Sequence, residues 1–175
     1  TDIGENRIQE AKAKREILDR AVRWHLIGHL QENKVKAAVR YCSLIHSVDS
    51  EKLLAAINRE ALRQAKVMKV LLQVNIAEEE TKFGFRLEEV SSVIQNSKEL
   101  KNIRICGLMV IGPHVEDQEE IRKVFLKGRQ LYDRLNSVRQ ENVKMEILSM
   151  GMSSDWKIAL ECDSNLLRLG RIMFD

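Results

Sequence analysis

Several features that would assign a function directly are scarce or missing in this sequence. The three cysteines, Cys42, Cys106 and Cys162, are odd in number and far apart, so neither a disulfide framework nor a metal site is expected. Free thiols favour a reducing cytoplasm. No apolar run is long enough to span a membrane, and we expect no signal peptide. Pro113 is the only proline, and it follows a predicted strand, where it breaks no ladder.

Charge is also nearly balanced. The net charge is +3, from 29 basic and 26 acidic side chains, and no run concentrates either sign. This pattern does not indicate a nucleic-acid partner. Hydrophobic residues make up 44% of the chain and charged residues 31%, an ordinary globular mixture. We therefore expect a single domain over residues 1–175, with no nucleic-acid or membrane partner.

A short apolar run, a turn and an amphipathic segment repeat along the whole chain. Such repeats predict parallel strands joined by helical crossovers. The runs are almost continuously apolar, as is typical of strands buried on both faces. The predicted strands cover residues 2–5, 24–28, 44–48, 69–76, 103–111, 147–150 and 166–174, and the predicted helices cover residues 6–18, 31–40, 50–65, 87–97, 117–139 and 153–162.

Seven strands and six helices fit either an open doubly wound sheet or a barrel. The open sheet would need a glycine-rich phosphate turn after an early strand, whereas Gly4 and Gly28 stand alone. We therefore predict an α/β fold, a parallel (β/α) barrel of the TIM type. A complete eightfold barrel has about 250 residues, so this chain is short by roughly one βα unit and terminal helices.

Two local features suggest anion binding at the carboxyl ends of the strands. In residues 149–155 (SMGMSSD), Gly151 lets the backbone approach a ligand, and Ser153 or Ser154 caps a helix start. Taken alone, this feature favours serines that only cap the helix over serines that bind a ligand. Farther along, Arg168 and Gly170 share one face of an apolar strand, where an arginine needs a partner. The alternative is an edge-strand arginine that reaches solvent.

Single polar or sulfur-containing residues give weaker indications. His25 lies on a predicted strand and is more typical of a core histidine, whereas His29 lies past a strand end and is a better candidate. Met109, Met150 and Met152 are more typical of core packing than of a site. No Ser/His/Asp arrangement and no pair of carboxylates indicates a hydrolase, so we assign no catalytic residue.

An ordered set of segments closely resembles the pyridoxal phosphate homeostasis protein family, whose fold is like the N-terminal barrel domain of alanine racemase. Each segment alone is weakly diagnostic, but together they cover nearly the whole chain in the expected order. They are residues 4–10 (GENRIQE), 24–34 (WHLIGHLQENK), 45–50 (IHSVDS), 73–76 (QVNI), 82–85 (KFGF), 107–109 (GLM), 148–153 (LSMGMS) and 168–170 (RLG).

The resemblance implies that pyridoxal 5′-phosphate (PLP) binds in the mouth of the barrel. The phosphate would lie near Ser153 and the backbone of Gly170 and Arg171. Arg168 would face the pyridine nitrogen and disfavour a protonated ring, which weakens the electron sink. Asn6 would line the ring side of the pocket, with Lys82 and Met109 nearby. The implied role is that of a PLP carrier or regulator in vitamin B6 and amino-acid homeostasis, without robust catalytic turnover, as a cytoplasmic monomer or weak homodimer.

Two other functions remain open. One is a PLP-dependent amino-acid racemase, which would need an acid/base pair and normally a tyrosine from a second domain. The other is a truncated barrel that binds only phosphate or sulfate.

The chain departs from the family's pattern in three places. The family's Schiff-base lysine lies on the first barrel strand, in a segment AVSKT, whereas Thr1 already corresponds to strand two. Lys34, Lys69 and Lys82 match other positions. Arg171 replaces a small hydroxyl residue of the family. Asp175 ends the sequence at the point where a glycine and a terminal segment follow in the family.

An absent first strand would leave two open sheet edges. Three explanations are residues outside the printed sequence, a shortened gene, or a strand from a neighbouring chain. We favour the first, because the chain does not begin with methionine.

Overall fold

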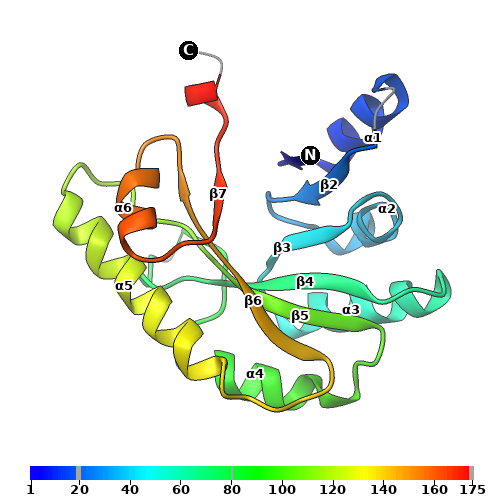
Figure 1. Ribbon diagram of the computed structural model, residues 1–175. Coiled ribbons are helices and arrows are strands. Elements are labelled where there is room, and N and C mark those ends of the chain that lie inside the picture. The colour runs from blue at the N-terminus through cyan, green and yellow to red at the C-terminus, as the bar shows by residue number, and fades with distance from the viewer. Residues whose placement is uncertain (19–20, 80, 174–175) are drawn as a thin grey trace.

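The computed structural model describes residues 1–18, 21–79 and 81–173, in which seven strands alternate with six α-helices (Figure 1). Short 3₁₀ turns η1 (Glu32–Lys34), η2 (Ser97–Glu99) and η3 (Arg171–Met173) adjoin them. The strands are β1 (Asp2–Glu5), β2 (Arg23–Leu26), β3 (Leu44–Val48), β4 (Met68–Val74), β5 (Ile103–Val110), β6 (Val143–Met152) and β7 (Leu166–Arg168). The helices are α1 (Ile8–Ile17), α2 (Val35–Tyr41), α3 (Glu51–Arg63), α4 (Val90–Asn96), α5 (Gln118–Leu135) and α6 (Trp156–Glu161).

The sheet is entirely parallel, and its spatial order, β1 to β7, follows the chain. It is also strongly curled. His46 on β3 lies 3.2 Å from Ser149 on β6, although β4 and β5 separate these strands in the sheet. Figure 1 shows the curled sheet with helices on its outer side. These relationships confirm the predicted α/β fold, a nearly closed parallel barrel of the TIM type.

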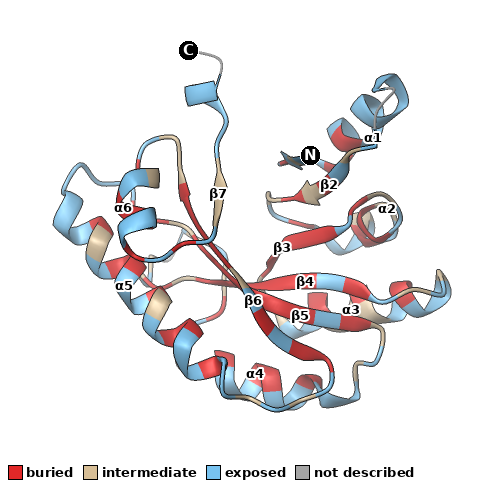
Figure 2. Cartoon of the chain, viewed as in Figure 1, coloured by how far each residue is buried: buried red, intermediate tan, exposed pale blue. Residues whose placement is uncertain are grey.

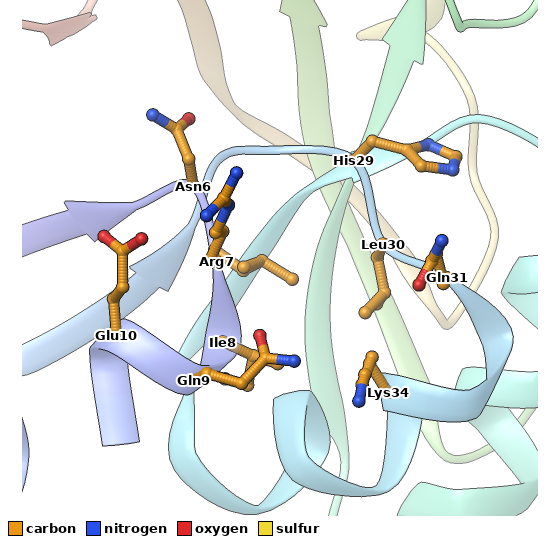
Figure 3. Close-up of a pocket in the computed structure, with 10 residues that line it drawn as sticks. Asn6, Arg7, Ile8, Gln9, Glu10, His29, Leu30, Gln31 and Lys34 are labelled. Carbon is orange, nitrogen blue, oxygen red and sulfur yellow. The ribbon is translucent and has the colours of Figure 1, made fainter. Parts of the chain in front are cut away.

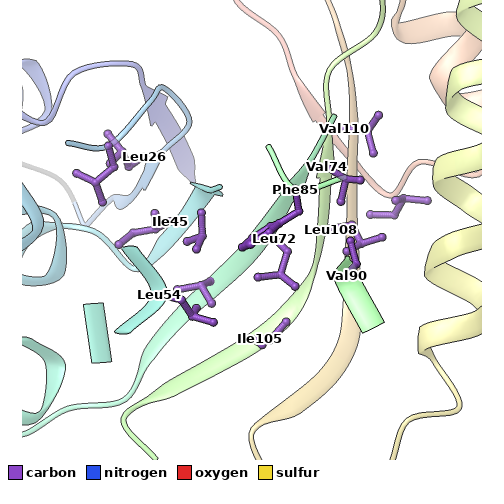
Figure 4. Close-up of a cluster of buried hydrophobic side chains, with 14 of the residues drawn as sticks. Leu26, Ile45, Leu54, Leu72, Val74, Phe85, Val90, Ile105, Leu108 and Val110 are labelled. Carbon is purple, nitrogen blue, oxygen red and sulfur yellow. The ribbon is translucent and has the colours of Figure 1, made fainter. Parts of the chain in front are cut away.

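Apolar side chains fill two layers, one outside the sheet and one inside. The outer layer lies between strands and helices, where Ile45, Leu72 and Phe125 are completely or almost completely buried (Figures 2 and 4). A smaller cluster joins Leu44, Leu71, Cys106 and Met109. Because side chains alternate along a strand, Leu44 shares the inward face of β3 with His46. The inner cluster therefore closes the barrel beneath a polar upper level.

The predicted starts of α3 and α5 are confirmed, because a side chain caps each of these helices. The Ser50 hydroxyl accepts a hydrogen bond from the Leu53 amide, and the Asp117 carboxylate accepts one from the Glu119 amide. The prediction that the last strand continues past Arg168 is wrong, because the chain leaves the sheet there and forms η3. Phe174 and Asp175 lie outside the described residues. No described helix has the length and apolar character needed to cross a bilayer.

Candidate functional site

A cavity of about 910 Å³ opens at the carboxyl ends of the strands. Its wall runs around the barrel from Asn6, after β1, through Lys82, after β4, to Arg171, after β7. The volume is typical of a small-molecule site. In barrel enzymes this end carries the functional loops. The fold therefore brings segments that are far apart in the sequence around one ligand-sized space.

Six of the seven residues that the sequence places at the site border this cavity. Met109 does not. Its side chain is completely buried in the inner cluster with Leu44, Leu71 and Cys106. The six that line the cavity are Asn6, Lys82, Ser153, Arg168, Gly170 and Arg171.

Arg168 points into the barrel, although it lies on the edge strand β7. Its Nη1 atom donates hydrogen bonds to the carbonyl oxygen of Ser149 at 2.8 Å and to the Ser149 hydroxyl at 2.7 Å. Its Nη2 atom donates to the carbonyl oxygen of Val110 at 3.0 Å. The alternative of an arginine that reaches solvent is therefore excluded. No carboxylate of the described residues lies within 4.0 Å of this guanidinium, so its hydrogen-bond partners in the protein are all neutral oxygen atoms.

Burial shapes the charge state of this arginine. Removal from water lowers the pKa of Arg168 to about 10, and the Asp155 carboxylate acts in the opposite direction. The guanidinium thus remains charged at neutral pH. A cation that faces a cavity without a close anionic partner favours an electron-rich ligand atom.

The turn after β6 differs from the prediction. α6 begins only at Trp156, so Asp155 occupies the N-cap position and the predicted capping by Ser153 or Ser154 is wrong. The Asp155 carboxylate accepts a hydrogen bond from the Met152 amide at 2.6 Å, which holds the chain in the turn. Ser153 is thereby left to accept a hydrogen bond from the Gly170 amide at 3.3 Å. This contact joins the ends of β6 and β7 at the cavity rim.

The two glycines of this region have different roles. Gly151 has a φ of +93°, and a Cβ atom there would lie 2.6 Å from the Cβ of Ala159. Its close approach is therefore to α6, where the sequence predicted approach to a ligand. A Cβ at Gly170 would meet no atom within 4 Å. Gly170 borders open space beside Ser153 and Arg171, as a ligand-facing backbone would.

The opposite wall is already engaged in internal contacts. Lys82 Nζ donates hydrogen bonds to Glu79 at 2.7 Å and to the carbonyl oxygen of Gly112 at 2.9 Å. His29 stacks on Phe83 with ring centroids 3.8 Å apart, and its Nδ1 atom lies 2.9 Å from the Asp49 carboxylate. These contacts give the wall a polar edge at Lys82 and an aromatic edge at Phe83.

A second cavity of about 490 Å³ adjoins the first across the loops after β1 and β2 (Figure 3). Asn6 and His29 border both cavities. The two loops touch closely, since a Cβ at Gly28 would lie 2.3 Å from the carbonyl oxygen of Asn6. Arg7 and Lys34 line only the smaller cavity. None of the residues predicted at the phosphate end borders it.

The floor of the large cavity contains residues that sequence reasoning did not select. His46 is completely buried, and His25 and Gln73 lie beside it on neighbouring strands. Every residue of β3 is buried, so no alternation of apolar and polar residues marks His46 as inward-facing. Within the described residues, no group of three or more His, Cys, Asp or Glu side chains is arranged to hold a metal ion.

Comparison with known proteins gives one consistent result. The family model described as alanine racemase, N-terminal domain, matches residues 1–175. A pyridoxal phosphate homeostasis protein of Aquifex aeolicus is 41% identical over 172 residues, which cover 98% of this chain and 75% of the relative. The PipY structure of Synechococcus elongatus without PLP is 34% identical, with a TM-score of 0.92, and covers 98% of this chain and 80% of its own. The PipY structure with PLP bound is 33% identical, with a TM-score of 0.88 and the same coverages.

Proposed function

We propose, because the chain belongs to the pyridoxal phosphate homeostasis protein family, that it binds PLP in its large cavity and acts as a PLP carrier or regulator. Its role would lie in vitamin B6 and amino-acid homeostasis. The observation that carries the proposal is Arg168, a charged guanidinium inside the barrel with neutral partners and a free side towards the cavity. The solved relative with PLP bound supports the choice of ligand.

The residues around the cavity fit the two polar ends of PLP. Ser153 and Arg171 offer a hydroxyl and a cation for the phosphate group, beside the backbone of Gly170, whose amide donates to Ser153. Arg168 can only donate hydrogen bonds, so it suits a ring nitrogen that carries no proton. Asn6 and Lys82 would flank the ring. Met109 supports the floor from below, through the inner cluster.

Bound PLP supplies a reactive aldehyde and an electron-withdrawing ring. Arg168 would keep the ring nitrogen unprotonated and so limit this electron withdrawal, because it has no proton acceptor. Such a site favours holding the cofactor over catalysing a reaction on it. We assign no covalent attachment to Lys34, Lys69 or Lys82, and Lys82 already bonds Glu79 and Gly112.

The racemase alternative finds less support in the described residues. A racemase needs an acid/base pair beside the cofactor. Tyr41 lies on α2 and Tyr132 on α5, both in the helical layer, and neither borders the large cavity. The phosphate-only alternative uses the same rim residues but leaves Arg168 without a role.

Titration of the purified full-length protein with PLP, pyridoxal and inorganic phosphate separates these functions. We expect PLP to bind more tightly than either part alone, with a change in its absorbance band. Equal affinity for PLP and phosphate would overturn the proposal in favour of an anion-binding barrel, and interconversion of alanine enantiomers would overturn it in favour of a racemase. Borohydride reduction followed by peptide mass measurement identifies any lysine that binds the cofactor covalently.

The same preparation tests two further parts of the proposal. We propose a monomer or weak homodimer, which sedimentation over a range of protein concentrations measures. We also propose a cytoplasmic location, which cell fractionation checks.

A further inference from the structure

A continuous row of polar contacts crosses the barrel beneath the cavity, from β7 to β1. Arg168 Nη1 lies 2.7 Å from the Ser149 hydroxyl, and this hydroxyl lies 3.2 Å from His46 Nδ1. His46 Nε2 lies 3.1 Å from His25 Nδ1. His25 Nε2 lies 3.4 Å from the Asp2 carboxylate, which is partly exposed at the barrel edge. Five strands thus contribute one residue each to a single row.

The groups at the two ends of the row determine which atom donates and which accepts in each of its hydrogen bonds. A guanidinium only donates hydrogen bonds, whereas an ionised carboxylate only accepts them. The Ser149 hydroxyl therefore accepts from Arg168 and gives its own proton to His46 Nδ1. His46 then carries its proton on Nε2 and donates to His25 Nδ1. His25 in turn carries its proton on Nε2 and donates to Asp2.

If every hydrogen bond in the row ran the other way, Asp2 would have no donor to accept from. If His46 Nδ1 donated to Ser149, its Nε2 would accept from His25 Nδ1. The unprotonated His25 Nε2 would then face a carboxylate oxygen, so two acceptors would meet. With both imidazoles neutral, one direction alone satisfies all four contacts, and it places the proton of each ring on Nε2.

The surroundings of both imidazoles favour this neutral form. Burial lowers the pKa of His46 to about 3, and His25 and the Arg168 cation act in the same direction. Burial also lowers the pKa of His25, while the Asp2 carboxylate opposes this change and Arg23 adds to it. Asp2 is itself held by two hydrogen bonds from Arg23, at 2.6 and 2.8 Å. A carboxylate is therefore available at the far end whenever the histidines are neutral.

We propose that His46 and His25 are positioning residues, which hold the Ser149 hydroxyl as an acceptor and thereby orient the Arg168 guanidinium towards the ligand ring. The inference deepens the proposed function and rests on it for the identity of the ligand. In a hydrogen-bonded row, each bond polarises the next, so the Asp2 charge strengthens the acceptor that meets Arg168. The matching ligand is a heteroaromatic ring that presents an unprotonated nitrogen.

The backbone contacts of Arg168 define what the row adds. The carbonyl oxygens of Ser149 and Val110 also accept from the guanidinium. These oxygens limit where the group lies, whereas the Ser149 hydroxyl is its only side-chain acceptor within the described residues. Loss of the row should therefore loosen the guanidinium without expelling it from the barrel.

Nuclear magnetic resonance of the ligand-free full-length protein tests the row without reference to PLP. Long-range proton–nitrogen spectra of the histidines should show His46 and His25 as neutral Nε2–H tautomers at pH 7. The Arg168 Nη signals should be separate, because rotation of the guanidinium is hindered. In His46→Phe these signals should merge, whereas in Ser149→Thr, which keeps the hydroxyl, they should stay separate. His46 protonated on Nδ1, or unchanged Arg168 signals in His46→Phe, would overturn the inference.

Ligand affinity supplies the second measurement. We expect His46→Phe to weaken PLP binding about fivefold, the order expected when one neutral hydrogen bond is lost, and to leave inorganic phosphate binding unchanged. Tyr41→Phe on α2 is the matched control, since Tyr41 borders neither cavity and its hydroxyl has no hydrogen bond or ion pair within the described residues. Equal PLP affinity in His46→Phe and Tyr41→Phe would overturn the inference. Absence of PLP binding in the unsubstituted protein would instead overturn the proposed function. The spectra of the ligand-free protein would still show whether the hydrogen bonds of the row exist.

Discussion

Arg168 on β7 donates a hydrogen bond past β6 to the carbonyl oxygen of Val110 on β5, with an N–O distance of 3.0 Å. The same guanidinium bonds Ser149 on β6 through its other terminal nitrogen. Such a bridge needs two terminal nitrogens in one plane, which only arginine provides. The curl of the sheet brings these acceptors together, so the barrel itself determines which side of the guanidinium faces the ligand.

We therefore expect Arg168→Lys to be a severe change despite its retained charge. A single ammonium cannot reach both Ser149 and Val110 in the same geometry, so PLP affinity should fall by about tenfold or more. Calorimetric titration with PLP measures the change. Arg104→Lys, on the exposed side of β5, is the control and should bind PLP normally. Full PLP affinity in Arg168→Lys would show that charge alone suffices.

Two glycines give opposite expectations for stability. A Cβ at Gly107 would lie 1.8 Å from the carbonyl oxygen of Ile147, and its φ is +149°. Gly107→Ala should therefore destabilise the fold by about 3 kcal/mol or more, since strain and overpacking each cost about 1–3 kcal/mol. Gly170→Ala meets no atom within 4 Å and should stay within about 0.5 kcal/mol. Denaturant unfolding measures the loss of stability in both variants. Equal losses in Gly107→Ala and Gly170→Ala would contradict the close contact between Gly107 and Ile147.

The sequence predicts the sheet well, because the strands are local apolar runs. Residues 2–5 and 44–48 are confirmed as strands with the predicted bounds. The turn after β6 was harder, since Ser153, Ser154 and Asp155 are consecutive residues that can all cap a helix. Asp155 takes the N-cap position, and its carboxylate accepts the Met152 amide three residues earlier, a local turn that the types of these three side chains do not determine.

The inward polar row could not be predicted from local patterns. Its contacts join residues as far as 103 positions apart, such as His46 and Ser149, and they exist only because the sheet curls. Met109 shows the opposite limitation. The resemblance places it near the ligand, but the inner cluster encloses its side chain beneath the cavity.

Acid should destabilise this protein through His46. Burial lowers the pKa of His46 to about 3 in the folded state, whereas an exposed histidine has a pKa of about 6.5, so the unfolded chain binds more protons between these pH values. Stability therefore rises with pH across this window and is lost as pH falls. His46 alone should remove about 2 kcal/mol between pH 7 and pH 5. The lowered pKa of His25 adds a contribution of the same sign.

Urea unfolding at pH 7 and pH 5 measures this dependence. His46→Phe removes the titrating group and should flatten the slope, whereas His114→Phe, at the exposed rim, should retain it. A slope that is the same in His46→Phe and the unsubstituted protein would show that other groups cause the acid sensitivity.

Ser153 and Ser154 are neighbours in one turn, but only the Ser153 hydroxyl accepts the Gly170 amide. If this rim binds the phosphate group, Ser153→Ala should weaken PLP binding several-fold, about 1 kcal/mol for one hydrogen bond. Affinity for pyridoxal, which lacks the phosphate, should not change, so the ratio of the two affinities is the measurement. Ser154→Ala is the matched control with the same loss of a hydroxyl. If both variants lowered the ratio equally, the phosphate would be held by the turn as a whole, and the assignment to Ser153 would be wrong.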